Sequence, residues 1–146
     1  MLPPRIQGDF GERAALHWLI GQGAQVSIPF GHSPHYDLIA DFGTELSRVQ
    51  VKTSVCPYNQ RWAVTLCTRG GNQSWGGLVK RFGTEHIDDL FVLVADGRQW
   101  FIPGARVEGG TAIHLGGPKY AEFEVERGAP IPDARVELPP LQSSSP

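Results

Sequence analysis

The sequence predicts an α/β domain in which an N-terminal helix is followed by a mixed central β-sheet. Two observations favour this class. Residues 9–21 carry apolar residues at helical spacing, whereas several later segments alternate apolar and polar residues as strands do. Residues 90–95 are apolar at every position, which is typical of a central strand covered on both faces. The 146 residues are enough for one hydrophobic core.

Composition and charge limit the function classes. A hydrophobic content of 40% and a charged content of 19% fit a soluble globular protein. The net charge of −2 gives no general signal for nucleic acid, so any such binding needs a local basic patch. Cys56 and Cys67 lack the spacing of a paired metal-ligand motif and are expected to be small buried thiols of a reducing compartment.

The domain organisation is expected to be simple. No apolar run approaches the roughly 20 residues that span a bilayer, so we expect no membrane partner. The first residues lack the charged-then-apolar layout of a signal peptide, which favours a cytoplasmic protein. We expect one domain over residues 1–127, followed by a flexible, Pro- and Ser-rich tail over residues 128–146.

The first expected element is a helix from Asp9 to Gly21, after an irregular lead-in over residues 1–8. Asp9 suits the N-cap, and Glu12 three residues later completes a capping-box pattern. Glu12 also stands at helical offsets from apolar residues that should face the core, Ala15, Leu16 and Leu19. Two interpretations stay open: Glu12 is a cap at the edge of this stripe, or it is a carboxylate directed from the helix into a site on the sheet.

A β-hairpin is expected next, after a first strand over residues 24–30. Its two strands are residues 36–40 and 46–53, and residues 41–45 between them contain the Asp and Gly of a turn.

The second hairpin strand places its chemistry on one face. Alternation directs its two valines one way, and it directs Arg48, Gln50 and Lys52 the other way. If the hairpin forms, Asp37, the only carboxylate of the first hairpin strand, can lie near Gln50 and Lys52. A carboxylate, an amide oxygen and a lysine that lie close together are what metal-dependent phosphodiester cleavage requires.

The remaining elements follow from alternation and turn residues. The expected strands are residues 61–68, 90–95 and 99–103, with weaker candidates at 113–115 and 120–125. Residues 56–60 and 96–97 are expected turns, and residues 78–82 are an expected short helical turn.

Two groups of potential metal ligands have simpler explanations. His32 and His35 are expected to be loop histidines without a metal, because their spacing suits a helix and the segment contains Pro and Gly. His86, Asp88 and Asp89 can form a second metal cluster, but we favour a polar lead-in to the buried strand that follows.

A glycine-rich loop over residues 69–77 fits neither the dinucleotide nor the Walker pattern. Its tryptophan, with basic residues nearby, can stack on a base or follow phosphates. The alternative is a mobile surface loop with a packing tryptophan. The candidate DNA contacts are residues of this region and two of the second hairpin strand: Arg48, Thr53, Arg69, Trp75, Lys80 and Arg81.

In order along the chain, Glu12 on a helix, Asp37 in Tyr-Asp-Leu and the run Gln50-Val51-Lys52 resemble the motif of the PD-(D/E)XK nuclease superfamily. The likeness is greatest to the archaeal Holliday-junction resolvases and the group I intron homing endonucleases of this fold. The buried strand and the strand after it are similar to the second half of the intron-endonuclease group. The resemblance covers about residues 8–104 and implies a restriction-endonuclease-like core.

This resemblance implies metal-assisted hydrolysis of DNA. Mg²⁺, with Mn²⁺ as its substitute, would be held by Asp37, the Gln50 carbonyl and the Val51 backbone carbonyl. Glu12 would bind it directly or through water. Lys52 would position the attacking water or stabilise charge on the phosphate. Cutting both strands with one small site per chain implies a homodimer or a higher homo-oligomer.

Gln50 departs from the superfamily pattern, which has an acidic residue at this position. Glutamine also occurs here in the intron-endonuclease branch, and its carbonyl oxygen suits a hard cation, although a carboxylate binds more tightly. Glu12 and Asp37 leave two formal negative charges, which is compatible with Mg²⁺. The departure favours the alternative that the chain is a catalytically inactive nuclease-fold module for DNA binding or protein interaction.

Overall fold

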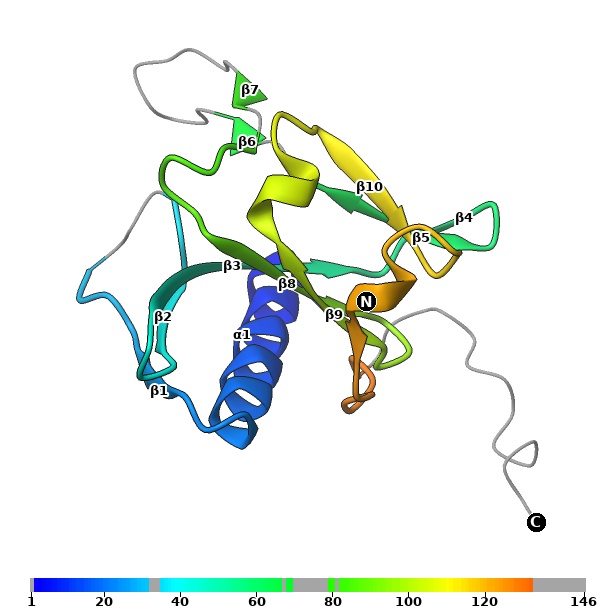
Figure 1. Ribbon diagram of the computed structural model, residues 1–146. Coiled ribbons are helices and arrows are strands. Elements are labelled where there is room, and N and C mark those ends of the chain that lie inside the picture. The colour runs from blue at the N-terminus through cyan, green and yellow to red at the C-terminus, as the bar shows by residue number, and fades with distance from the viewer. Residues whose placement is uncertain (1, 32–34, 67, 70–78, 81, 133–146) are drawn as a thin grey trace.

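The computed structural model describes residues 2–31, 35–66, 68–69, 79–80 and 82–132. Within these ranges a long helix covers one face of a six-stranded mixed sheet, and a small three-stranded sheet packs on the other face (Figure 1). The expected class, an N-terminal helix before a mixed central sheet, is confirmed.

The described elements fall into four groups. The long helix is α1 (Pro4–Gly21). The main sheet contains, in spatial order, β1 (Gln25–Ser27), β2 (Leu38–Asp41), β3 (Leu46–Ser54), β8 (Asp89–Val94), β9 (Gln99–Pro103) and β11 (Glu124–Val125). The small sheet contains β10 (Ala112–Leu115), β5 (Arg61–Thr65) and β4 (Pro57–Tyr58). The rest are the paired strands β6 (Thr68–Arg69) and β7 (Val79–Lys80), and the 3₁₀ turns η1 (Gly104–Val107) and η2 (Ala121–Phe123).

Strands β3 and β8 form the centre of the main sheet. They run parallel, with Val49 opposite Asp89 and Ser54 opposite Val94, whereas the other described neighbours in this sheet are antiparallel. A parallel pair needs a crossover connection. Here the crossover contains β4 and β5, so the same chain that links β3 to β8 also covers one face of the sheet.

Strand β8 separates two hydrophobic cores. Leu90, Val92 and Val94 pack with residues of the small sheet, whereas Phe91 and Leu93 pack under α1. Every one of these five side chains is at most 2% exposed. The run that is apolar on both faces is therefore a central strand, as predicted.

Helix α1 begins earlier than the sequence predicts. It starts at Pro4, and no side-chain hydrogen bond caps its N-terminus. Asp9 is therefore not the N-cap, Glu12 is not part of a capping box, and the irregular lead-in over residues 1–8 is wrong from Pro4 onward. The physical reason is that proline in the first turn has a helical φ and lacks an N–H group that would need a partner. The helix ends at Gly21, as predicted.

The buried face of α1 contains Ala15 and Leu19 of the predicted stripe, whereas Leu16 is only partly buried. Its buried residues recur every four positions: Gln7, Gly11, Ala15 and Leu19. Glu12 lies beside this row and is exposed. At Gly11 the helix approaches β3 so closely that an added Cβ would lie 2.5 Å from Thr53 Cγ2. The absence of a side chain at Gly11 therefore permits the contact that brings Glu12 close to the sheet.

Several other boundaries differ because tertiary pairing, rather than local alternation, decides where a strand ends. β1 and β5 are shorter than the strands predicted over residues 24–30 and 61–68. Residues 57–58 of an expected turn pair with β5, and residues 79–80 pair with β6 instead of forming a helical turn. The last predicted strand contributes only β11, after the 3₁₀ turn η2.

The prediction of a buried thiol is wrong for Cys56, which is exposed just before β4. Cys67 lies outside the described residues.

The chain stays on the domain after β11. The Ile131 N–H donates to the Ala95 carbonyl at 3.0 Å, and the Ile131 side chain is only 3% exposed. The flexible tail predicted over residues 128–146 is therefore not observed for residues 128–132, because one buried isoleucine outweighs the tail-like composition around it. The later part of the predicted tail lies outside the described residues.

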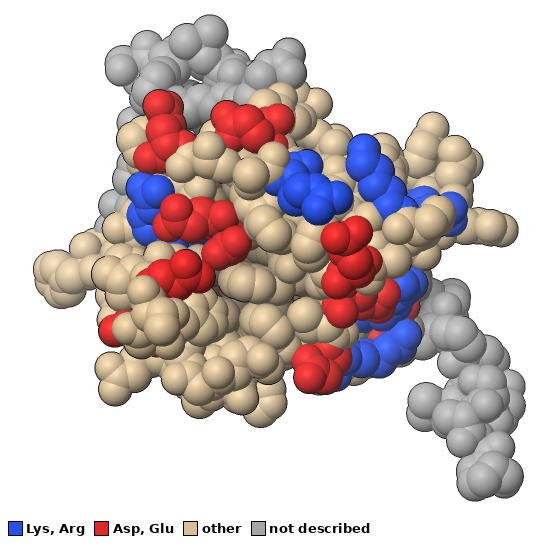
Figure 2. Space-filling model, viewed as in Figure 1, with Lys and Arg blue, Asp and Glu red and all other residues tan. Residues whose placement is uncertain are grey.

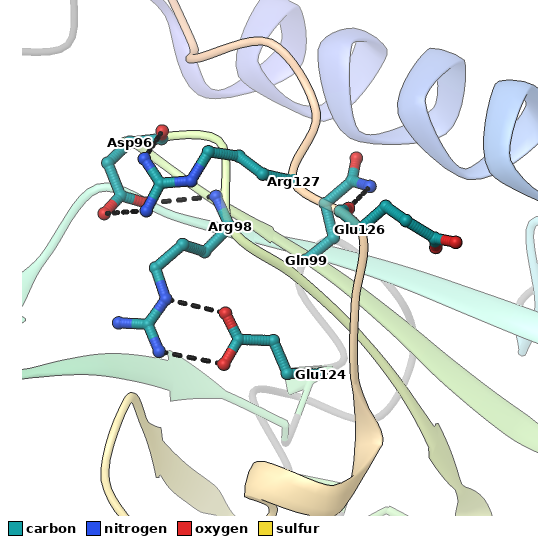
Figure 3. A network of polar contacts seen from close by, with 6 residues as sticks. All are labelled: Asp96, Arg98, Gln99, Glu124, Glu126 and Arg127. Carbon is teal, nitrogen blue, oxygen red and sulfur yellow. Dashed lines mark hydrogen bonds and ion pairs between the residues drawn. The ribbon is translucent and has the colours of Figure 1, made fainter. Parts of the chain in front are cut away.

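Polar contacts join residues 124–126 to Arg98 and Gln99 at the start of β9 (Figure 3). The Arg98 guanidinium donates two hydrogen bonds to the Glu124 carboxylate, at 2.8 and 2.9 Å. The Gln99 Nε2 donates to the Glu126 carbonyl at 2.7 Å. These contacts hold β11 and the residues that follow it against the edge of the main sheet.

Candidate active site

The candidate site lies where β2 parts from β3. The two strands pair as far as Leu38, which lies opposite Val49. One residue earlier, the Asp37 N–H donates to the Val49 carbonyl at 2.9 Å, and Asp37 Oδ2 accepts a hydrogen bond from the Val51 N–H at 2.8 Å. Asp37 thus precedes β2 rather than lying inside the strand predicted over residues 36–40. Its carboxylate accepts the hydrogen bond from the Val51 N–H that a further backbone carbonyl of β2 would otherwise accept.

The β2–β3 register, continued by one residue, brings Asp37 opposite Gln50, as the expected hairpin requires. Gln50 and Lys52 alternate with Val49 and Val51, which pack under α1, so the two polar side chains share the other face of β3. Burial raises the pKa of Asp37. The hydrogen bond from Val51 and the charge of Lys52 lower it by less, so the net shift is upward.

Glu12 approaches the same corner from the helix. It follows Gly11, whose contact with Thr53 holds α1 close to β3. The pKa of Glu12 is raised, first by burial and then by the negative charges of Asp37 and Asp9. Glu12 is exposed, but the effect of Asp37 means that the two carboxyl groups lie close enough to repel each other. A cation between them would relieve this repulsion.

The Gln50 amide has one satisfied end and one unsatisfied end. Its Nε2 donates to the His35 carbonyl at 3.3 Å. Its Oε1 is buried and has no hydrogen-bond partner among the described residues. A buried, unpaired amide oxygen costs free energy, and a hard cation such as Mg²⁺ accepts this type of ligand. The orphaned oxygen therefore fits the metal that the resemblance implies.

Val51 adds a backbone oxygen to this donor set. In a β-strand the N–H and C=O of one residue point to the same side, so the Val51 carbonyl faces the side on which its N–H meets Asp37. No group of three or more His, Cys, Asp and Glu placed to hold a metal exists in the described part of the chain. The candidate donor set does not require one, because it combines two carboxylates with an amide oxygen and a backbone oxygen.

Two of the candidate DNA contacts have partners inside the domain. The Arg48 guanidinium donates to the Asp88 carboxylate through Nε at 2.9 Å and Nη2 at 3.0 Å, which lowers the pKa of Asp88. The Thr53 methyl group faces Gly11. The other four candidates lie outside the side chains that the structure describes: Arg69, Trp75, Lys80 and Arg81.

The sequence did not reveal one contact beside the site. His35 and His86 stack, with ring centroids 4.0 Å apart and planes inclined by 16°. Each was interpreted only as a residue of its own polar segment. No local pattern could have joined them, because they lie far apart in the chain and meet only after β3 and β8 pair.

Acidic groups gather around the end of the sheet where β2 and β3 lie, on the left of the view in Figure 2. The pKa of Asp89, at the start of β8, is raised first by burial and then by the charges of Asp88 and Glu45, while its hydrogen bond from Ser47 Oγ lowers it. Negative groups repel a nucleic-acid backbone. A phosphate would therefore approach this end of the sheet most readily in the company of a bound cation.

A helix on a mixed sheet, with a helix carboxylate near the carboxylate that precedes β2, and with Gln50 and Lys52 on the neighbouring strand β3, defines a restriction-endonuclease-like nuclease fold. The chain belongs to the PD-(D/E)XK endonuclease family, because the family model of that description matches residues 3–115. This membership confirms the resemblance seen in the sequence.

Solved structures give the same fold. The chain is similar to a bacterial homing endonuclease, I-Ssp6803I, with a TM-score of 0.70 and 21% sequence identity. The match covers 82% of this chain and 87% of that chain. No curated protein sequence matches the chain. No helix among the described residues is long and apolar enough to cross a membrane.

Proposed function

We propose that this chain is a metal-dependent endodeoxyribonuclease that hydrolyses phosphodiester bonds. One observation carries the proposal: the Asp37 carboxylate is fixed on the Val51 N–H beside Lys52, and the buried Oε1 of Gln50 has no partner among the described residues. Family membership supports nuclease chemistry. The fold shared with a homing endonuclease supports DNA as the substrate.

The proposed roles are those that the family resemblance implies. Mg²⁺, or Mn²⁺ in its place, would be held by Asp37, Gln50 Oε1 and the Val51 carbonyl, with Glu12 bound directly or through water. Such an ion supplies Lewis-acid activation of the scissile phosphate. The Val51 N–H keeps the Asp37 carboxylate in place. Lys52 orients the attacking water and stabilises negative charge on the phosphate.

The proposed partner is DNA, cut by a homodimer or a larger homo-oligomer, because one small site per chain cuts one strand at a time. The proposed DNA contacts bind phosphates and stack on bases: Arg69, Trp75, Lys80 and Arg81. Arg48 and Thr53 are left out, because Asp88 and Gly11 already contact them.

Nicking of supercoiled plasmid tests the proposed function. The wild-type protein should convert supercoiled DNA to open-circular or linear product with Mg²⁺ or Mn²⁺, and EDTA should stop the reaction. Asp37→Asn is the matched inactive control. A four-way junction and a long linear duplex, tested in parallel, distinguish junction-resolving from homing-endonuclease-like activity. A wild type that cuts none of these substrates with either ion contradicts the proposal.

A second candidate function is DNA binding or protein interaction without cleavage. The neutral Gln50 favours it, because only Glu12 and Asp37 then contribute negative charge to the metal position. A gel-shift assay in Ca²⁺, which can support binding without cleavage, separates the two forms of this candidate. A shift in Ca²⁺ without cleavage in Mg²⁺ supports DNA binding, whereas no shift favours protein interaction.

A further inference from the structure

The Gln50 amide has two chemically different ends. Its Oε1 can bind a hard cation, whereas its Nε2 carries only N–H donors and repels one. A glutamate at this position would present an oxygen in either orientation. Only the glutamine therefore needs a neighbour that decides which end faces the metal position.

The neighbour in this structure is the His35 carbonyl. It accepts the hydrogen bond from Gln50 Nε2 and so leaves Oε1 as the buried, unpaired end. The distance of 3.3 Å is longer than the usual 2.9–3.0 Å of an N–H···O bond. The hydrogen bond is thus a weak restraint on its own, and the position of His35 decides whether it forms.

The His86 ring restrains His35. The two imidazoles stack at 4.0 Å with nearly parallel planes. His86 belongs to the segment before β8, and this segment is tied to β3 on both sides of His86. Arg48 Nη1 donates to the Glu85 carbonyl at 3.2 Å, and the Asp88 N–H donates to the Arg48 carbonyl at 2.8 Å.

Arg48 completes the connection back to the site. Its guanidinium binds both carboxylate oxygens of Asp88, at 2.9 and 3.0 Å. Arg48 stands two residues before Gln50 on β3. Strand β3 therefore carries both the Gln50 amide and the arginine that holds the segment before β8 in place. That segment includes Asp88 and His86, and His86 contacts His35, which binds the amide.

We propose that His86 is a positioning residue for Gln50: its ring holds His35 so that the His35 carbonyl binds Nε2 and Oε1 remains available to the metal. The inference rests on the proposed metal-dependent function and deepens it. His86 does not touch the metal or the DNA in this role.

The first experiment uses the protein without metal. His86→Ala removes the stacked ring, and His86→Phe keeps a ring of similar breadth. The readout is the side-chain amide signal pair of Gln50 in ¹H–¹⁵N NMR spectra, identified by its absence in Gln50→Glu. We expect His86→Ala to shift this pair towards the position of a free amide, and His86→Phe to retain it. His17→Ala, on the exposed side of α1, is the control and should leave the pair unchanged.

The second experiment measures metal affinity from the rise in melting temperature on titration with Mg²⁺ or Ca²⁺. We expect His86→Ala to weaken the affinity by about tenfold, a typical effect of losing a residue that orients a metal ligand. In the Gln50→Glu background the same substitution should have no effect, because a carboxylate needs no orientation. His86→Phe should restore the affinity in the Gln50 background.

The outcomes separate the inference from the proposed function. A wild type whose melting temperature does not respond to either metal overturns the proposed function, and the inference falls with it. A wild type that responds, with an equal loss for His86→Ala in both backgrounds, overturns the inference alone, since that loss would reflect general destabilisation. A Gln50 amide signal that His86→Ala leaves unchanged also overturns the inference.

Discussion

Asp37 Oδ2 accepts a hydrogen bond from the Val51 N–H at 2.8 Å, across the gap where β2 turns away from β3. This bond satisfies a backbone donor that has lost its strand partner. It also fixes a carboxylate whose pKa is raised by burial. The structural role needs only an acceptor oxygen, whereas metal binding needs the negative charge, so substitution can separate the two.

Asp37→Asn should abolish cleavage and leave the fold intact. Asparagine keeps an oxygen for the Val51 N–H but removes the charge, so we expect the nicking rate to fall by at least about 100-fold. Asp37→Ala should also lose about 1–3 kcal/mol of stability, because the Val51 N–H loses its acceptor. Plasmid nicking and thermal melting measure both effects. Cleavage by Asp37→Asn at the wild-type rate would show that the carboxylate is not a ligand.

Glu12→Gln should lose activity with little change in melting temperature. Glu12 lies in the interior of α1 and does not cap it, so no helix-end bond is lost. The substitution removes a charge that Asp37 repels, which favours the folded protein slightly at neutral pH. Asp9→Asn, one turn earlier on the same helix, is the control and should remain active. Unchanged activity of Glu12→Gln would exclude Glu12 from the site.

Gln50→Glu should bind Mg²⁺ more tightly, because it adds a negative charge beside Asp37 at nearly constant volume. Gln50→Leu should bind it less tightly, because it removes the oxygen and keeps the bulk. The measurement is the Mg²⁺ concentration for half-maximal cleavage, or for half-maximal thermal stabilisation if the wild type is inactive. Identical metal dependence for Gln, Glu and Leu would mean that residue 50 does not face the ion.

In the metal-free protein, the charge of Asp37 should affect the titration of the Glu12 carboxyl group. Both pKa values are raised, so these groups favour the folded state at low pH, and this contribution is lost as the pH rises through the folded pKa values. Metal binding has the opposite dependence and should strengthen over the same range. In Asp37→Asn the pKa of Glu12 should fall, because one repelling charge is gone. Carboxyl ¹³C NMR titration measures it, and an unchanged Glu12 midpoint would place the two groups apart.

Gly11→Ala should destabilise the protein and reduce cleavage. The new Cβ would lie 2.5 Å from Thr53 Cγ2 and 3.1 Å from Val51 Cγ1, so α1 must move away from β3 and carry Glu12 with it. We expect a loss of about 1–3 kcal/mol. Gly8→Ala, on the same helix with nothing within 4 Å, is the matched control and should gain up to about 1 kcal/mol. Equal melting temperatures for the two variants would contradict the close approach at Gly11.

Much of the candidate site could be predicted from the sequence. Strand alternation assigned Gln50 and Lys52 to one face of β3, and the turn between the hairpin strands set the register that brings Asp37 opposite Gln50. Glu12 was harder, because spacing along the helix fits both a capping residue and a ligand. The start of α1 at Pro4 excludes the capping role, and the effect of Asp37 on the pKa of Glu12 supports the other interpretation.

The sequence by itself determined the α/β class and the central buried strand, because each depends on periodicity within a few consecutive positions. The order of the motif residues was recognised through the resemblance to the PD-(D/E)XK superfamily. The tertiary structure alone decided that Ile131 is buried, that Arg48 binds Asp88, and that the stacked pair of His35 and His86 stands beside Gln50. These contacts join segments that are distant in the chain. Their free energy appears only when those segments pack together, so no local pattern of residues encodes them.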